Sequence, residues 1–130
     1  MSPATEVVKA FYAALGRGDL PAVLNLLHPQ IEWTEVKGFP YYNGTWRSHQ
    51  EIIDGLLGPL NRDWNGFAAT PHEFLSENGR VVSFGSYSGT AKSTGKQMRA
   101  AFAHRWEVRG EKITRFDMVA DTFLVREALR

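Results

Sequence analysis

Glu35 has the residue type and the neighbours of a general base. It follows Ile31 and Trp33 at alternating positions, with Glu32 and Thr34 between them. Alternate residues of a β-strand share one face, so the carboxyl group is expected to point inward with the two apolar side chains. Burial in such a place raises the pKa of a carboxyl group towards the range in which a general base works. The pattern fits equally well a carboxylate that lies in water at the rim of the fold.

His104 is a second group suited to proton transfer or to hydrogen bonding with a ligand. Phe102 and Trp106 flank it at alternating positions, so it is expected to share a strand face with aromatic side chains. A buried neutral imidazole donates a hydrogen bond from one ring nitrogen and accepts one at the other. The alternative is a core histidine that bonds a backbone carbonyl group and has no part in chemistry.

Other familiar chemistries are not indicated by the sequence. It contains no phosphate-binding loop, dinucleotide fingerprint or nucleophile elbow. There is no cysteine, and the histidines do not have the spacing of metal ligands. We therefore expect no metal ion and no cofactor. The histidines are His28, His49, His72 and His104.

Three helices are expected in the first half of the chain, because apolar residues there recur at helical spacing. Ser48 and Glu51 have the spacing of a capping box, and Gly58-Pro59 closes the helix that they open. The expected helices cover residues 7–15, 20–27 and 48–57.

Strands are expected to dominate the rest of the chain. The pair Asn78-Gly79 is a strong signal for a two-residue hairpin between two of them. A final short helix is expected to begin at Asp121 or Thr122 and to end near Leu129. The expected strands cover residues 31–35, 67–77, 81–89, 97–109 and 112–120.

This order of elements predicts a single α+β domain of 130 residues, in which three N-terminal helices pack on a curved, mostly antiparallel sheet and a short helix ends the chain. Hydrophobic residues make up 43% of the chain, which is enough for a core. The space between sheet and helices is expected to be either core or cavity.

Charge and composition exclude several classes of partner. The formal net charge is +1 and the basic residues form no run, so we expect neither nucleic acid nor a membrane surface as a partner. No apolar stretch is long enough to cross a bilayer, and the polar residues 1–6 lack the core of a signal peptide. Together with the absence of cysteine, this suits a cytoplasmic protein.

The chain resembles the superfamily of nuclear transport factor 2-like domains, which includes the ketosteroid isomerases and SnoaL-like polyketide cyclases. The resemblance spans nearly the whole chain and implies a cone-shaped, cystatin-like fold. A first block of residues matches the isomerases, and a second block matches the SnoaL-like branch. The first block is Val7-Val8, Ala13-Ala14-Leu15, Gly18-Asp19-Leu20, Glu35 and Gly44-Thr45; the second is residues 102–106, 112–116 and Asp121-Thr122.

The resemblance implies roles for the two candidate groups. Glu35 is placed where the isomerases keep an aspartate that carries the proton, and His104 lies near their protonated aspartate that holds the developing oxyanion. The isomerases also carry an oxyanion-binding tyrosine on the first helix, where this chain has Phe11. Tyr12 is next to it, but one residue turns a helix by about 100°, so Tyr12 is expected to face elsewhere. Tyr41, Tyr42 and His104 remain as other donors.

Two aspartates near the end of the chain have alternative interpretations. SnoaL-like cyclases place an acid–base aspartate on or just after the final strand, and Asp121 matches that place. An aspartate before a short helix is also a good N-cap, which the sequence favours slightly for Asp121. Asp117 is expected to be a surface carboxylate paired with Arg115.

Two functions are compatible with these residues. The first is a cofactor-free isomerase or cyclase of the isomerase or lyase classes, in which Glu35, His104 and Asp121 act on a small apolar carbonyl compound. The second is a non-catalytic module that binds a small molecule or dimerises. The resemblance implies a homodimer through the outer sheet face, with Arg99, Arg105, Glu107 and Arg109 on that face, although a solvated face fits these residues almost as well. The expected pocket residues are Phe11, Leu15, Trp33, Phe39, Tyr42, Trp46, Ile53, Leu57, Phe74, Phe84, Phe102, Trp106 and Met118.

Overall fold

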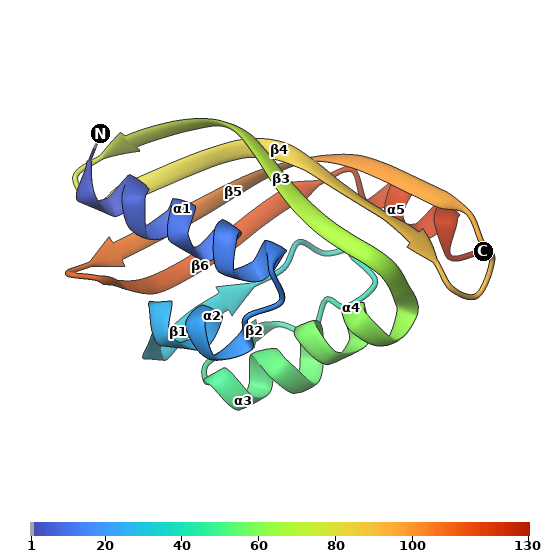
Figure 1. Cartoon of the computed structure of the whole chain (residues 1–130), viewed down its shortest axis with the longest axis horizontal. Coiled ribbons are helices and arrows are strands. Elements are labelled where there is room, and N and C mark those ends of the chain that lie inside the picture. The colour runs from blue at the N-terminus through green and yellow to red at the C-terminus, as the bar shows by residue number, and fades with distance from the viewer. Residues whose placement is uncertain (1) are drawn as a thin grey trace.

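A curved sheet forms the larger part of the molecule, with most of the helices gathered on one side of it (Figure 1). The computed structural model describes residues 2–130. Within that range the sheet has six strands in the order β2-β1-β6-β5-β4-β3, and all neighbours are antiparallel except β1 and β6. The strands are β1 Leu27–Thr34, β2 Thr45–Trp46, β3 Trp64–Glu77, β4 Arg80–Ala91, β5 Gln97–Arg109 and β6 Lys112–Ala120.

The helices begin where the sequence provides side chains that accept hydrogen bonds from the first turn. Ser2, Asp19, Ser48 and Asp121 each accept a hydrogen bond from the backbone N–H three residues later. These caps open α1, α2, α3 and α5 in turn. The helices are α1 Pro3–Gly16, α2 Leu20–Leu26, α3 His49–Ile52, the π-helical segment η1 Ile53–Leu57, α4 Gly58–Asp63 and α5 Thr122–Ala128.

The third expected helix is longer and less regular than the sequence indicates. The sequence predicts its end at Gly58-Pro59, but α3, η1 and α4 follow one another without a break as far as Asp63. A proline inside an α-helix normally removes a backbone hydrogen bond and collides with the preceding turn. The π-helical turn before Pro59, in which the Gly58 N–H bonds the Ile53 carbonyl, widens the helix and lets it restart. In residues 2–130, four α-helical segments therefore precede β3, rather than the three expected.

Strand alternation divides the sheet into a buried and an outer face. On β5, Met98 to Val108 are buried at every second position, and the residues between them are mostly exposed. On β4 the buried face carries Ser83, Gly85 and Tyr87. The sheet curves around α1, which lies across its buried face (Figure 1).

Gly85 marks the point at which the sheet bends. It pairs with Pro71 of β3, where the register shifts by a β-bulge. A Cβ atom at Gly85 would collide with the carbonyl oxygen of Thr70 and with the ring of Phe102. Because bulges and glycines let strands bend sharply, this contact allows β3 and β4 to fold over the helices.

No helix within residues 2–130 is long and apolar enough to cross a membrane.

Candidate active site

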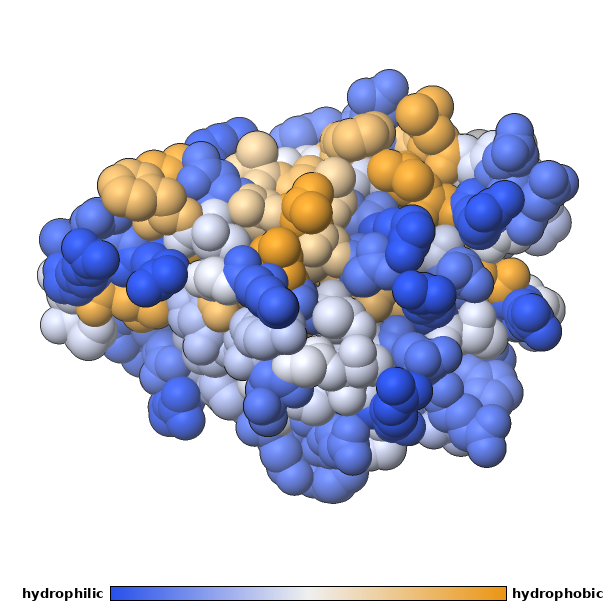
Figure 2. Space-filling view, turned by 180° about the vertical axis from the view of Figure 1, so that it is seen from behind, coloured by the Kyte–Doolittle hydropathy of each residue, from blue (hydrophilic) through white to orange (hydrophobic). Residues whose placement is uncertain are grey.

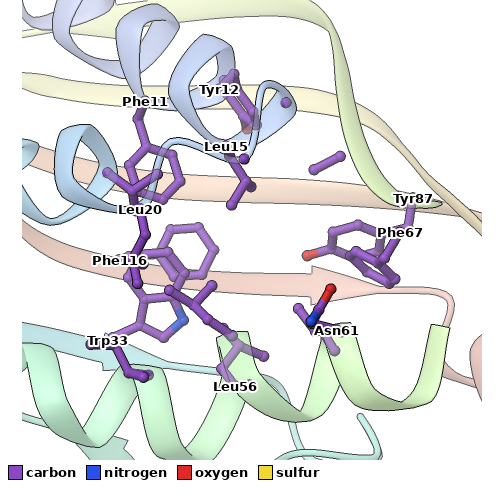
Figure 3. A pocket seen from close by; sticks show the side chains of 18 of the residues that line it. Phe11, Tyr12, Leu15, Leu20, Trp33, Leu56, Asn61, Phe67, Tyr87 and Phe116 are labelled. Atoms are coloured by element: carbon purple, nitrogen blue, oxygen red, sulfur yellow. The ribbon is translucent and has the colours of Figure 1, made fainter. Parts of the chain in front are cut away.

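A cavity of about 600 Å³ lies between the buried sheet face, α1 and α2, and the continuous helix from α3 to α4 (Figure 3). Its volume is in the range of about 300–1,000 Å³ that is typical of small-molecule sites. Leu20, Asn61 and Gly66 line it and are exposed, so it opens to solvent between α2, α4 and β3. The wall includes eight of the expected catalytic and pocket residues: Phe11, Leu15, Trp33, Glu35, Ile53, Leu57, His104 and Trp106.

Some of the expected pocket residues lie in the core beside the cavity instead. Phe39 is buried and packs on Tyr87, and the centroids of these two rings lie 6.0 Å apart. Phe102 stacks on the ring of His104 at 3.7 Å. Trp46 lies so close to Gly55 that a Cβ atom there would collide with its indole. These rings support the wall because they fill the layer behind it. Two further expected pocket residues also lie outside the lining: Phe74, which is half-buried under α1, and Met118, which is buried.

Two other expected pocket residues and one expected catalytic residue lie at the surface. Phe84 is 39% exposed, because it has the opposite strand parity to Tyr87 and so faces outward from β4. Tyr42 is 38% exposed in the loop before β2. Asp121 is exposed and accepts a hydrogen bond from the Leu124 N–H, so the structure places it as the N-cap of α5 and away from the cavity.

Glu35 follows directly after β1 and keeps the strand parity of Ile31 and Trp33. It is 4% exposed and lines the cavity. Burial raises the pKa of its carboxyl group to about 8, while the indole of Trp33 acts in the opposite direction. Among residues 2–130, neither Glu35 Oε2 nor Trp33 Nε1 has a partner in full hydrogen-bond geometry. The carboxyl group is therefore buried, incompletely bonded and able to change its charge near neutral pH.

His104 is also buried, but both of its ring nitrogens are bonded within the protein. Its Nδ1 lies 2.6 Å from the hydroxyl of Tyr12, and its Nε2 lies 2.7 Å from the hydroxyl of Tyr87. Burial holds the pKa of the imidazole well below its ordinary value, so the ring is neutral. The structure thus gives His104 side-chain partners rather than a bond to a backbone carbonyl.

The expectation that Tyr12 faces away from the site is wrong. Its ring is 7% exposed, and its hydroxyl bonds both His104 Nδ1 and Ser83 Oγ at 2.6 Å. The apolar stripe of a buried helix is wider than about 100°, so adjacent residues both reach the interior when a sheet curves around the helix. Phe11 accordingly contacts Trp33, with centroids 5.8 Å apart, while Tyr12 stacks beside His104.

Tyr87 is a site residue that the sequence reasoning missed altogether. It lies on the buried face of β4, lines the cavity, and presents its hydroxyl towards the space between the walls (Figure 3). Burial raises the pKa of its hydroxyl well above the ordinary value, and the nearby charge of Glu35 adds to this. Strand parity from Ser83 through Gly85 would have found Tyr87 in place of Phe84.

Asp117, the other aspartate singled out in the sequence, lies outside the cavity. Asp117 is bonded by Arg105 of β5 at 2.7 Å, and Arg115 lies 3.5 Å from it. The expected pairing with Arg115 is thus present, with Arg105 as the shorter contact. Within the described part of the chain, no group of three or more His, Asp or Glu side chains is arranged to hold a metal ion.

Comparison with known families places the chain. The model of the SnoaL-like domain matches residues 8–116. The chain belongs to the SnoaL-like family. This fold family includes polyketide cyclases and isomerases, so membership by itself does not select a reaction. A comparison with curated proteins found no match.

Solved structures share the fold over nearly the whole of this chain. An NTF2-like protein from Burkholderia thailandensis has 36% sequence identity and a TM-score of 0.92, over 100% of this chain and 99% of the other. TerC, crystallised with polyporic acid, has 30% identity and a TM-score of 0.88, over 98% of each chain. A protein with a cystatin-like fold from Xanthomonas campestris has 19% identity and a TM-score of 0.81, over 97% and 95% of the two chains, and shows the fold alone.

Proposed function

We propose that this protein is a cofactor-free enzyme that moves a proton next to a carbonyl group of a small apolar ligand, as isomerases and aldol-type cyclases do. The observation that carries the proposal is the state of Glu35. Its carboxyl group is buried, lacks a partner at Oε2 within residues 2–130, and borders a cavity lined mainly by apolar residues. A carboxyl group with a pKa of about 8 can exchange a proton with a ligand near neutral pH.

The reaction needs only the residues of the cavity. Ionised Glu35 removes a proton from the carbon beside the carbonyl group, and the electron pair of the C–H bond moves into the ligand to give an enolate. The Glu35 carboxyl group then returns the proton to another carbon in an isomerisation. In a cyclisation, the enolate carbon instead attacks a second carbonyl group, and the new alkoxide takes the proton. Apolar walls favour this chemistry because the exclusion of water strengthens the electrostatic interactions that stabilise the charged intermediate.

The size and lining of the cavity support a flat, mostly apolar ligand. Aromatic rings from α1, β1 and β6 form one side, where Phe11, Trp33 and Phe116 lie together (Figure 3). Phe67 and Tyr87 form the other side, with ring centroids 5.3 Å apart. The related protein TerC was crystallised with polyporic acid, which supports a small organic ligand for this cavity too.

Exchange of ligand protons for deuterium tests the proposal without knowledge of the natural substrate. A panel of cyclic ketones is incubated with the protein in D₂O, and loss of the proton beside the carbonyl group is followed by NMR. The wild-type protein is expected to accelerate exchange, and Glu35→Gln is expected to lose about 10²–10⁴-fold of the acceleration. The control is Glu32→Gln, which changes an exposed carboxylate of β1 that pairs with Arg47. Equal exchange in wild type and Glu35→Gln would refute the role of Glu35.

A binding module without catalysis is the second candidate, and a specific observation favours it. Position 11 carries Phe, which has no hydroxyl, and the hydrogen bonds of His104 are all made within the protein. In that case the ketones would bind with no exchange above the rate in solvent. The same panel therefore separates the two functions.

We also propose that the outer sheet face pairs with a second copy of this chain. Phe84 and Val119 are 39% and 61% exposed, and Ala103 lies between them in the strand register. The paired charges of Arg105 and Asp117 border this apolar centre. From behind, apolar residues gather over the upper half of the molecule (Figure 2).

Sedimentation measures the pairing. The wild-type protein is expected to sediment as a dimer, and Phe84→Glu as a monomer, because a buried unpaired carboxylate opposes association. The control is Tyr42→Glu, which adds a charge at an exposed aromatic side chain of the loop before β2. A monomeric wild type would refute the pairing.

A further inference from the structure

A continuous series of hydrogen bonds crosses the buried face of the sheet and reaches the cavity. It begins at an indole N–H, passes through two hydroxyl groups and an imidazole, and ends at a third hydroxyl group. The links are Trp106 Nε1 to Ser83 Oγ at 2.9 Å, Ser83 Oγ to Tyr12 Oη at 2.6 Å, Tyr12 Oη to His104 Nδ1 at 2.6 Å, and His104 Nε2 to Tyr87 Oη at 2.7 Å.

The direction of the series follows from the proton of Ser83. The indole of Trp106 can only donate, so Ser83 Oγ accepts there. Ser83 is 0% exposed, and within residues 2–130 its hydroxyl has one other partner, Tyr12. If Ser83 does not donate to Tyr12, its own proton is buried without an acceptor, which carries a substantial penalty. Ser83 therefore donates to Tyr12.

The next two links are then fixed in turn. The oxygen of Tyr12 accepts from Ser83, so its proton goes to its remaining partner, His104 Nδ1. A neutral imidazole that accepts at one nitrogen carries its proton on the other. His104 Nε2–H therefore donates to the oxygen of Tyr87.

The proton of Tyr87 is left over at the end of the series. The oxygen of Tyr87 is already the acceptor for His104, and within the described residues its hydroxyl has no further partner. The side chain lines the cavity and its hydroxyl points into it (Figure 3). We infer that Tyr87 donates a hydrogen bond to an oxygen of the bound ligand, and that the ligand class is an apolar molecule with a carbonyl or enolate oxygen at this position.

This inference rests on the cavity of the proposed function but not on proton transfer by Glu35. Each donor in the series polarises the next, so the terminal hydroxyl is a stronger donor than it would be without the hydrogen bond from His104. Tyr87 contacts the ligand, whereas Ser83, Tyr12 and His104 are positioning residues that orient its proton. The missing hydroxyl at Phe11 is thus replaced by one on the opposite wall of the cavity.

The tautomer of His104 tests the direction of the series. In protein labelled with ¹⁵N-histidine, the ring nitrogens report by NMR which one carries the proton. The signals of His104 are assigned with variants in which His28, His49 and His72 are replaced by Gln one at a time. We expect a neutral ring with the proton on Nε2. A proton on Nδ1, or on both nitrogens, would overturn the inference.

Ser83→Ala sharpens this measurement. Removing the hydroxyl removes the donor that orients Tyr12, so the ring of His104 is expected to change to the other tautomer or to a mixture. The control is Ser88→Ala, on the same strand with the opposite parity, which should leave the spectrum of His104 unchanged. An unchanged tautomer in folded Ser83→Ala would contradict the assigned direction.

A ketone and a hydrocarbon of the same shape test donation to the ligand. The probes are 9-fluorenone and fluorene, and binding is followed by tryptophan fluorescence, since Trp33 and Trp106 line the cavity. Tyr87→Phe is expected to bind fluorenone about tenfold more weakly than the wild type and to bind fluorene equally well. The control is Tyr42→Phe. The carbonyl stretch of bound fluorenone should lie at lower frequency in the wild type than in Tyr87→Phe.

The outcomes separate this inference from the proposed function. Equal carbonyl frequencies in wild type and Tyr87→Phe, or no binding of either probe by the wild type, would overturn the role of Tyr87. Glu35→Gln should retain the preference for fluorenone, because Glu35 takes no part in the series. A protein that prefers fluorenone but does not accelerate deuterium exchange would therefore refute proton transfer by Glu35. It would leave the role of Tyr87 as hydrogen-bond donor to the ligand intact.

Discussion

Glu35 and His104 lie in the wall of the same cavity and are buried to the same extent, yet their surroundings differ. His104 is bonded at both ring nitrogens, and its series of partners extends to the indole of Trp106. Glu35 has a carboxyl oxygen without a partner within residues 2–130. A satisfied buried group fixes geometry, whereas an unsatisfied one destabilises the fold and is retained where it does chemistry. The contrast supports the proposed roles, in which His104 positions other groups and Glu35 transfers the proton.

Removing His104 is expected to have the largest effect on stability. His104→Ala leaves a cavity and deprives the hydroxyls of Tyr12 and Tyr87 of a partner, so the free energy of unfolding should fall by about 3–5 kcal/mol. Chemical denaturation measures it. The control, His72→Ala, changes an exposed side chain and should stay within about 0.5 kcal/mol of the wild type. An equally small change in His104→Ala would mean that the series contributes little to the fold.

Removing the charge of Glu35 is expected to change how stability depends on pH. The pKa of Glu35 is raised from 4.5 to about 8 by burial, so the folded state binds more protons than the unfolded state between these values. The free energy of unfolding of the wild type should therefore fall, relative to Glu35→Gln, as the pH rises from 4.5 to 8. The full difference is roughly 3–5 kcal/mol, at about 1.4 kcal/mol for each pKa unit.

Denaturation of both proteins at several pH values measures this difference. Glu32→Gln serves as the control, because Glu32 is exposed on β1, directly before Glu35 in the chain order of acidic residues. His104 affects stability in a lower pH range. Burial lowers the pKa of its imidazole, so the folded state binds fewer protons there than the unfolded state, and the free energy of unfolding falls as the pH drops below 6.5. Parallel curves for wild type and Glu35→Gln between pH 4.5 and 8 would contradict the raised pKa.

Removing Asp121 is expected to have the smallest effect. Asp121→Ala removes the cap of α5 and should lower the free energy of unfolding by about 0.5–2 kcal/mol. Asp121→Asn keeps an acceptor for the Leu124 N–H and should recover most of the loss. Deuterium exchange of ketones should be unchanged in both variants. If Asp121→Asn kept its stability but lost the acceleration of exchange, Asp121 would have a part in the reaction, which contradicts its assignment as a helix cap.

Strand alternation predicts that Glu35, directly after β1, and His104, on β5, share a strand face with apolar neighbours, but it left a carboxylate at the rim as an equal alternative for Glu35. Glu35 and His104 lie where the parity of their neighbours places them, because the period of a strand is fixed by its backbone. The same rule applied to β4 selects Tyr87. Phe84 has the opposite parity, and only its aromatic side chain suggested that it lines the pocket. The order of the four strands of the second half is also accessible from the sequence, since each pair is joined by a short turn.

The sequence could not indicate contacts that depend on curvature. Tyr12 reaches His104 because the sheet bends around α1, and the bend depends on a bulge opposite Gly85. The continuation of α3 beyond Pro59 depends on a π-helical turn that no propensity signals. The approach of Glu35 to Tyr87 depends on the parallel pairing of β1 with β6, which joins segments far apart in the chain.

The ionisation of Glu35 can be measured directly, and the proposed proton transfer depends on it most. In protein labelled with ¹³C at the glutamate carboxyl carbon, the resonance of Glu35 is identified by its absence from Glu35→Gln and followed as the pH is raised. Burial beside the cavity predicts a midpoint near pH 8. A midpoint near the ordinary value of 4.5 would contradict this prediction, since the carboxylate would then be charged and solvated at neutral pH, with no reason to act on a ligand.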